Sequence, residues 1–137
     1  MIVVDTNLIA YLFLTSDRSA HAEQILRSDA DWAAPLLWRS ELRNVLSLYL
    51  RKQLLALADA QVIMSEALRL MHGREYEVNS EQILNLAASS TCSAYDCEFV
   101  ALASDLGVPL VTVDRQLLQQ FPRVAISPEQ FLSLSRL

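Results

Sequence analysis

Four acidic residues lie where structural elements are expected to begin or end, and this placement is the first sign of chemistry in the sequence. Asp5 and Asp114 each end an apolar, strand-like run, Asp96 falls in the first turn of an expected helix, and Glu41 lies early in another. In a parallel sheet, the carboxyl ends of the strands and the starts of the helices that follow them share one edge. We therefore expect the four carboxylates to meet at that edge.

Carboxylates gathered in this way raise one another's pKa, because like charges disfavour ionisation. Hard divalent cations with oxygen ligands relieve this repulsion, and Mg²⁺ or Mn²⁺ are the natural candidates. Such a site activates water and neutralises charge on a phosphodiester, as nucleases with two ions ~3.5–4 Å apart do. Taken alone, Asp5 also fits a turn or capping role, Asp96 a helix N-terminus and Asp114 a turn.

The composition is compatible with this chemistry. The 137 residues carry 11 basic and 16 acidic side chains, a net charge of −5 that argues at first sight against nucleic acid. Without the four acids above, 11 basic residues face 12 acidic ones, so a metal-filled site leaves a phosphodiester substrate possible. Cys92 and Cys97 fit neither a disulfide framework nor a zinc site, and we expect two buried thiols.

The elements that must position the acids alternate between strands and helices. With 53% hydrophobic residues and only 2 glycines, the chain is expected to form one domain over residues 1–137. No run of ~18 apolar residues and no signal peptide is recognised, which predicts a cytoplasmic protein with no membrane partner. The alternation predicts an α/β fold with a mostly parallel sheet covered by helices on both faces. The expected strands are 2–4, 32–35, 76–78, 110–113 and 124–126, and the expected helices are 8–12, 21–27, 36–52, 58–72, 83–89, 95–106, 116–120 and 131–134.

Four segments, taken in order, resemble the motifs of a known family. Ile2–Asn7, Ser40–Leu42, Ser93–Ala103 and Leu110–Asp114 are similar to the ordered motifs of the PIN-domain ribonucleases, and most closely to VapC-type toxins of bacterial toxin–antitoxin pairs. The resemblance covers essentially the whole chain. It implies a three-layer α/β/α domain, hydrolysis of RNA with Mg²⁺ or Mn²⁺, a homodimer, and neutralisation by a small cognate antitoxin protein.

Carried over by position, the resemblance makes Asp5, Glu41, Asp96 and Asp114 the acidic metal-binding quartet. We expect Asp5 and Asp96 to hold the principal ion, Asp114 to complete or bridge its site, and Glu41 to orient or deprotonate the attacking water. Many relatives have a further acid shortly after the fourth, whereas Arg115 follows Asp114 here. This departure leaves open whether one ion or two are held tightly.

Several neighbours of the acids have expected roles in supporting them or in binding substrate. Asn7 and Thr112 match polar positions of the family near the quartet. Arg39, Arg43 and Arg115 are the cations nearest the acids in sequence, and they either bind flanking phosphates or are solvated helix-face charges.

Other interpretations remain open at this stage. An apolar excess in Leu36–Trp38 and Leu46–Leu57 indicates either a dimer or antitoxin interface or a thick core. Asp5 is also placed like the nucleophile of an aspartyl-phosphate phosphatase, although Asn7 stands where such enzymes usually carry a second acid. A third alternative is a PIN-like module that binds RNA or protein without catalysis.

Overall fold

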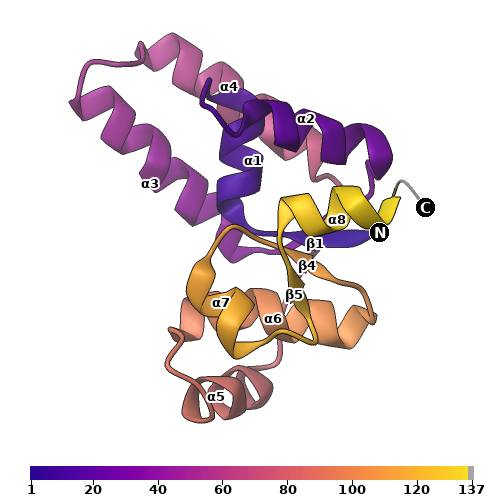
Figure 1. Cartoon of the computed structure of the whole chain (residues 1–137). Coiled ribbons are helices and arrows are strands. Elements are labelled where there is room, and N and C mark those ends of the chain that lie inside the picture. The colour runs from indigo at the N-terminus through magenta and orange to yellow at the C-terminus, as the bar shows by residue number, and fades with distance from the viewer. Residues whose placement is uncertain (136–137) are drawn as a thin grey trace.

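Five short parallel strands form the centre of the structure, a computed structural model that describes residues 1–135 (Figure 1). Their order across the sheet is β3-β2-β1-β4-β5, and each neighbouring pair is parallel. The expected mostly parallel sheet is thus confirmed. The strands are β1 (Ile2–Val4), β2 (Trp32–Pro35), β3 (Glu75–Tyr76), β4 (Leu110–Val111) and β5 (Ala125–Ile126).

Helices cover both faces of this sheet, which gives the three-layer α/β/α arrangement. In Figure 1, α5, α6 and α7 lie below the strands, while α1, α2 and α8 lie above them. Helices α3 and α4 form a hairpin that extends away from the sheet. The helices are α1 (Thr6–Phe13), α2 (Ser19–Ser28), α3 (Leu37–Arg51), α4 (Leu57–Leu70), α5 (Ser80–Ala88), α6 (Ala94–Leu106), α7 (Arg115–Gln120) and α8 (Pro128–Ser135).

The buried residues explain why the first strand is central. Ile2, Val3 and Val4 are all buried, as expected for a β-branched run between two helical layers. Burying each of these side chains is worth ~1.5–3 kcal/mol. Trp32 and Trp38 are fully buried beside them, and both cysteines are buried and free, as predicted. Within residues 1–135, none of the helices has the length and apolarity needed to cross a bilayer.

The strand order creates a crevice at the end of β1. The chain passes from β1 to β2 on one side and later returns to β4 on the other. In open α/β sheets, ligands bind at such a reversal of strand order, outside the carboxyl ends of the strands. Val4 is paired with Val111, so the residues that follow them, Asp5 and Thr112, leave the sheet side by side.

Most predicted boundaries differ from the observed ones by one to three residues, and three of these differences concern the sheet and the start of α1. The strand predicted over residues 110–113 ends at Val111, because the backbone N–H of Asp114 donates to the hydroxyl of Thr112 at 3.0 Å as the chain turns into α7. The strand predicted over 76–78 is Glu75–Tyr76 instead. Helix α1 begins at Thr6, directly after Asp5, rather than near residue 8.

Candidate active site at the carboxyl edge of the sheet

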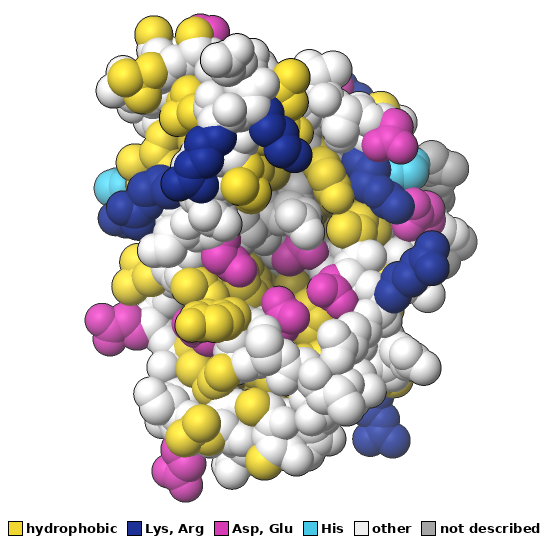
Figure 2. All heavy atoms as spheres, turned by 90° about the vertical axis from the view of Figure 1, so that its left-hand side faces the viewer, with side chains coloured by type: hydrophobic (Ala, Val, Ile, Leu, Met, Phe, Trp, Pro, Cys, Tyr) yellow, Lys and Arg dark blue, Asp and Glu magenta, His cyan; other side chains and the backbone are white. Residues whose placement is uncertain are grey.

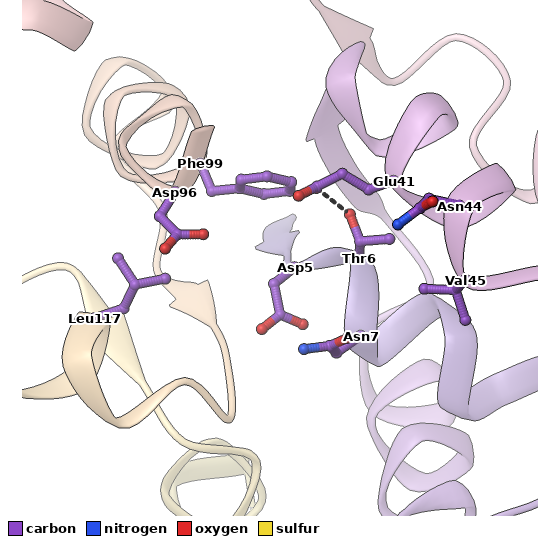
Figure 3. Close-up of a pocket in the computed structure, with 9 residues that line it drawn as sticks. All are labelled: Asp5, Thr6, Asn7, Glu41, Asn44, Val45, Asp96, Phe99 and Leu117. Atoms are coloured by element: carbon purple, nitrogen blue, oxygen red, sulfur yellow. Dashed lines mark hydrogen bonds between the residues drawn. The ribbon is translucent and has the colours of Figure 1, made fainter. Parts of the chain in front are cut away.

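A cavity of about 200 Å³ lies at the carboxyl end of β1, between α1, α3 and α6 (Figure 3). Three of the four predicted acids line it: Asp5, Glu41 and Asp96. The expectation that distant acids meet at one edge of the sheet therefore holds for these three. The lining residues are Asp5, Thr6, Asn7, Glu41, Asn44, Val45, Asp96, Phe99 and Leu117.

Asp5 has both a structural and a chemical role available to it. As the N-cap of α1, its Oδ1 accepts a hydrogen bond from the backbone N–H of Leu8 at 2.9 Å. Its Oδ2 accepts a second bond, from the hydroxyl of Thr112. Burial raises the pKa of Asp5 to about 6, against the lowering effect of these two bonds. The capping interpretation of Asp5 is correct, and the same carboxylate also faces the cavity.

Glu41 enters the cavity from the first half of α3. The hydroxyl of Thr6 donates a hydrogen bond to its Oε1 at 2.7 Å, drawn as the dashed line in Figure 3. Partial burial raises the pKa of Glu41, the bond from Thr6 lowers it, and the charges of Asp96 and Asp5 raise it further. Glu41 is therefore close enough to both other cavity acids to be influenced by their charge.

Asp96 and Asp114 complete the group in different ways. Asp96 lies in the first turn of α6, and its own backbone N–H donates to the N-cap hydroxyl of Ser93 at 3.1 Å. Asp114 caps α7, where its side chain accepts from the backbone N–H of Leu117 at 3.0 Å. Burial raises the pKa of Asp96 most. Asp114 does not line the cavity, but its charge also raises the pKa of Asp96 and that of Asp5.

The site offers oxygen donors, but they do not form a preorganised metal-binding site. Among residues 1–135, no three acidic, histidine or cysteine side chains are grouped closely enough to hold a metal by themselves. Magnesium does not require three grouped protein ligands, because it keeps several of its waters and binds through one or two carboxylates. The donor chemistry thus fits a hydrated hard cation. Figure 2 shows acidic side chains gathered in a hollow, with basic side chains on the surface around it.

The three candidate arginines lie in different surroundings. Nε and Nη2 of Arg39 both donate to the carboxylate of Glu75 on β3, which also accepts from the indole N–H of Trp38 at 2.7 Å. Arg43 is exposed one helical turn further along α3, and its Nε donates to the carbonyl oxygen of Arg39. Arg115 is exposed at the start of α7.

Five of the lining residues were not predicted as site residues. Thr6 is buried and holds Glu41, and its only sequence signal was its position next to Asp5. Asn44 lies three residues after Glu41, a spacing that places both on one face of a helix and was available from the sequence. Val45 and Phe99 were expected only as apolar residues of a helix face, and Leu117 was not singled out. Asn7, by contrast, was predicted and lines the cavity. Thr112 was also predicted; it does not line the cavity but donates a hydrogen bond to Asp5.

Comparisons with known proteins agree with this architecture. The chain is 30% identical over 124 residues to a protein named Ribonuclease VapC3 from Pyrobaculum aerophilum, an alignment that covers 88% of this chain and 95% of the relative. The crystal structure of PAE2754 from the same organism superposes with a TM-score of 0.77 at 24% identity, covering 98% of this chain and 96% of the other.

A third structure, described as a toxin–antitoxin complex from Klebsiella pneumoniae, gives a TM-score of 0.69 at 17% identity over 93% of this chain and 98% of the other. At these identities the two solved structures support the fold alone. The model of the PIN domain matches residues 2–126, which include all four predicted acids. The chain therefore belongs to the PIN-domain family.

Proposed function

We propose that this protein is an endoribonuclease that hydrolyses RNA phosphodiester bonds with Mg²⁺ or Mn²⁺ and acts as the toxin of a toxin–antitoxin pair in the cytoplasm. One observation supports this proposal above the others: Asp5, Glu41 and Asp96, distant in sequence, line one cavity at the switch point of a parallel sheet. The relationship to a protein named as a ribonuclease points to RNA as the substrate.

In this proposal, Asp5 and Asp96 hold the principal cation and Asp114 completes its site from the start of α7. When bound, a divalent ion neutralises charge on the scissile phosphate and lowers the pKa of water. The raised pKa of Asp5 and of Asp96 supports the assignment, because groups that resist ionisation in the free protein gain most from a cation.

Glu41 orients the attacking water and accepts its proton. Its raised pKa favours this role, since a general base is most effective when its pKa approaches the working pH. The hydrogen bond from Thr6 fixes one carboxylate oxygen, which leaves the other free to face the water. Asn7 and the exposed Arg43 and Arg115 are the proposed substrate contacts.

The test is cleavage of a fluorogenic RNA by the purified chain, with Mg²⁺, with Mn²⁺ and with a chelator. Asp5→Asn and Asp96→Asn are expected to abolish cleavage while the circular dichroism spectrum stays unchanged. Asp105→Asn is the matched control, because Asp105 is exposed at the far end of the same helix as Asp96. Equal activity in all variants, or in the chelator, would reject the assignment.

An antitoxin partner and a homodimer are the proposed assemblies. Part of the predicted apolar excess is core, since Trp38 and Leu46 are buried. Another part is surface: near the end of the α3–α4 hairpin, Leu54 and Leu57 are 66% and 61% exposed. Such a surface is typical of an interface. Light scattering is expected to give the mass of a dimer at micromolar concentration. Expression of the chain is expected to arrest growth, and a small protein encoded beside its gene, if there is one, should restore growth when it is co-expressed.

The rival functions predict different results. A module without catalysis would bind RNA or a partner protein with no cleavage and no change on Asp5→Asn. An aspartyl-phosphate phosphatase would use Asp5 as its nucleophile, and such enzymes usually carry a second acid two residues later, where this chain has Asn7. Trapping a phosphate mimic covalently on Asp5 would favour the phosphatase over the nuclease.

A further inference from the structure

Asn44 is a polar residue of the cavity for which the acidic site provides no role. It lies on α3, three residues after Glu41, and lines the same cavity. Its side chain is exposed and makes no hydrogen bond with any residue between 1 and 135. In Figure 3 it lies on the side of the cavity opposite Asp96.

The cavity is therefore chemically asymmetric. Asp96 brings a carboxylate from α6 and Asp5 one from the end of β1, whereas the side formed by α1 and α3 carries the neutral amides of Asn7 and Asn44 together with the carboxylate of Glu41, one oxygen of which is held by Thr6 (Figure 3). The carboxylates suit a cation and the phosphate that it binds. An amide cannot neutralise a phosphate, but it both donates and accepts hydrogen bonds. The two amides therefore suit a neutral, hydrogen-bonding part of the same nucleotide.

A hydrolytic site of this kind needs such a contact in order to select RNA. Attack of water on a phosphodiester makes no use of the ribose 2′-hydroxyl, so the reaction by itself treats RNA and DNA alike. The 2′-hydroxyl is both donor and acceptor, and a contact to it is how a protein distinguishes RNA from DNA at a given position. Asn44 supplies both complementary groups from a single side chain.

We propose that the amide of Asn44 hydrogen-bonds the 2′-hydroxyl of the nucleotide beside the scissile phosphate, and thereby selects RNA over DNA. The inference rests on the proposed function for the identity of the substrate. Val45 lies next to Asn44 in the lining and gives the sugar an apolar surface on which to rest. Asn44 is a specificity residue here, and the acids retain the chemistry.

The experiment measures binding and cleavage of one oligonucleotide in three forms: all RNA, RNA with a single 2′-deoxy position next to the mapped cut, and all DNA. Binding is followed by fluorescence anisotropy in Ca²⁺, an oxygen-liganding ion. The proteins are the wild type, Asn44→Ala, and the control Asn85→Ala, because Asn85 is exposed on α5 and outside the cavity.

Asn44→Ala is expected to weaken binding of the RNA, and lower kcat/KM, by about tenfold, the effect of one hydrogen bond. The same variant should leave the 2′-deoxy form and the DNA unchanged, so its preference for RNA is lost, while Asn85→Ala behaves as wild type. An equal loss on all three forms, or no loss on RNA, would overturn the inference.

The two proposals fail in different ways. If the wild type binds RNA more tightly than DNA through Asn44 but cuts neither, the nuclease proposal fails and the role of Asn44 stands. If the wild type cuts RNA and Asn44→Ala keeps the full preference for RNA, the role of Asn44 fails and the nuclease proposal stands. Binding of none of the three forms would reject both.

Discussion

The hydroxyl of Thr112 donates a hydrogen bond to Oδ2 of Asp5, and so joins the residue after β4 to the residue after β1. The same hydroxyl accepts from the backbone N–H of Asp114 at 3.0 Å. One fully buried side chain thus fixes the carboxylate of Asp5 and the turn that carries Asp114.

Removal of this hydroxyl is expected to affect both stability and ionisation. Thr112→Val keeps the shape of the side chain but leaves two buried groups unpaired, and should lower the free energy of unfolding by about 1–3 kcal/mol. Because the bond lowers the pKa of Asp5, its loss should raise that pKa further. Urea denaturation and carboxyl NMR titration measure the two effects. Thr112→Ser should behave nearly as wild type. A Thr112→Val variant with unchanged stability and an unchanged pKa of Asp5 would contradict the two hydrogen bonds described for this hydroxyl.

Asp5 should make the metal-free protein less stable as the pH rises. Its pKa is about 6 when folded and near 3.8 when unfolded, so between these values the folded state binds the additional proton. The loss of folding free energy caused by ionising Asp5 is absent below about pH 3.8 and complete above about pH 6, where it reaches about 3 kcal/mol. Asp5→Asn should therefore gain stability relative to wild type over this range, measured by thermal unfolding in a chelator. Parallel pH curves for the two proteins would exclude the effect.

The bond from Thr6 should set the acidic limb of the pH–rate profile. Because this bond lowers the pKa of Glu41, Thr6→Val should raise that pKa and shift the rise in kcat to higher pH. Thr6→Ser should restore the original profile, since it keeps the hydroxyl. A decrease in kcat at every pH with no shift of the limb would instead indicate a general loss of structure.

Arg39 and Arg43 should differ in their effect on RNA affinity. The guanidinium of Arg39 is engaged by Glu75, whereas Arg43 is exposed on the next turn of α3. Arg43→Ala is expected to weaken RNA binding and to reduce the salt dependence by about one phosphate contact. Arg39→Ala should leave the salt dependence unchanged and lower stability instead. Anisotropy titrations at several salt concentrations, together with urea denaturation, separate the two outcomes.

The sequence was most informative where burial leaves a pattern. The β-branched run before Asp5 marked a central strand, because a strand covered on both faces is apolar at every position. Three of the four acids then proved to line one cavity, since parallel strands present their carboxyl ends at one edge. β3 was misplaced by one residue because a two-residue strand carries almost no pattern.

Hydrophobic periodicity in the sequence could not predict hydrogen bonds between residues far apart in the chain. Thr6 meets Glu41 across 35 positions, and Arg39 meets Glu75 across 36, and neither pair leaves a local signal. Asn44 was within reach, because its spacing from Glu41 places it on the same helical face. It was overlooked because a single uncharged amide on the exposed face of a helix does not stand out from the other polar residues there.

The wide separation of the pocket residues along the chain has a consequence for synthesis. Asp5 leaves the ribosome among the first residues, but its buried partner Thr112 directly follows β4, a strand that pairs with β1 only after more than three quarters of the chain has emerged. No shorter nascent fragment contains the assembled pocket. A nascent chain that ends before Thr112 is therefore expected to lack the proposed activity.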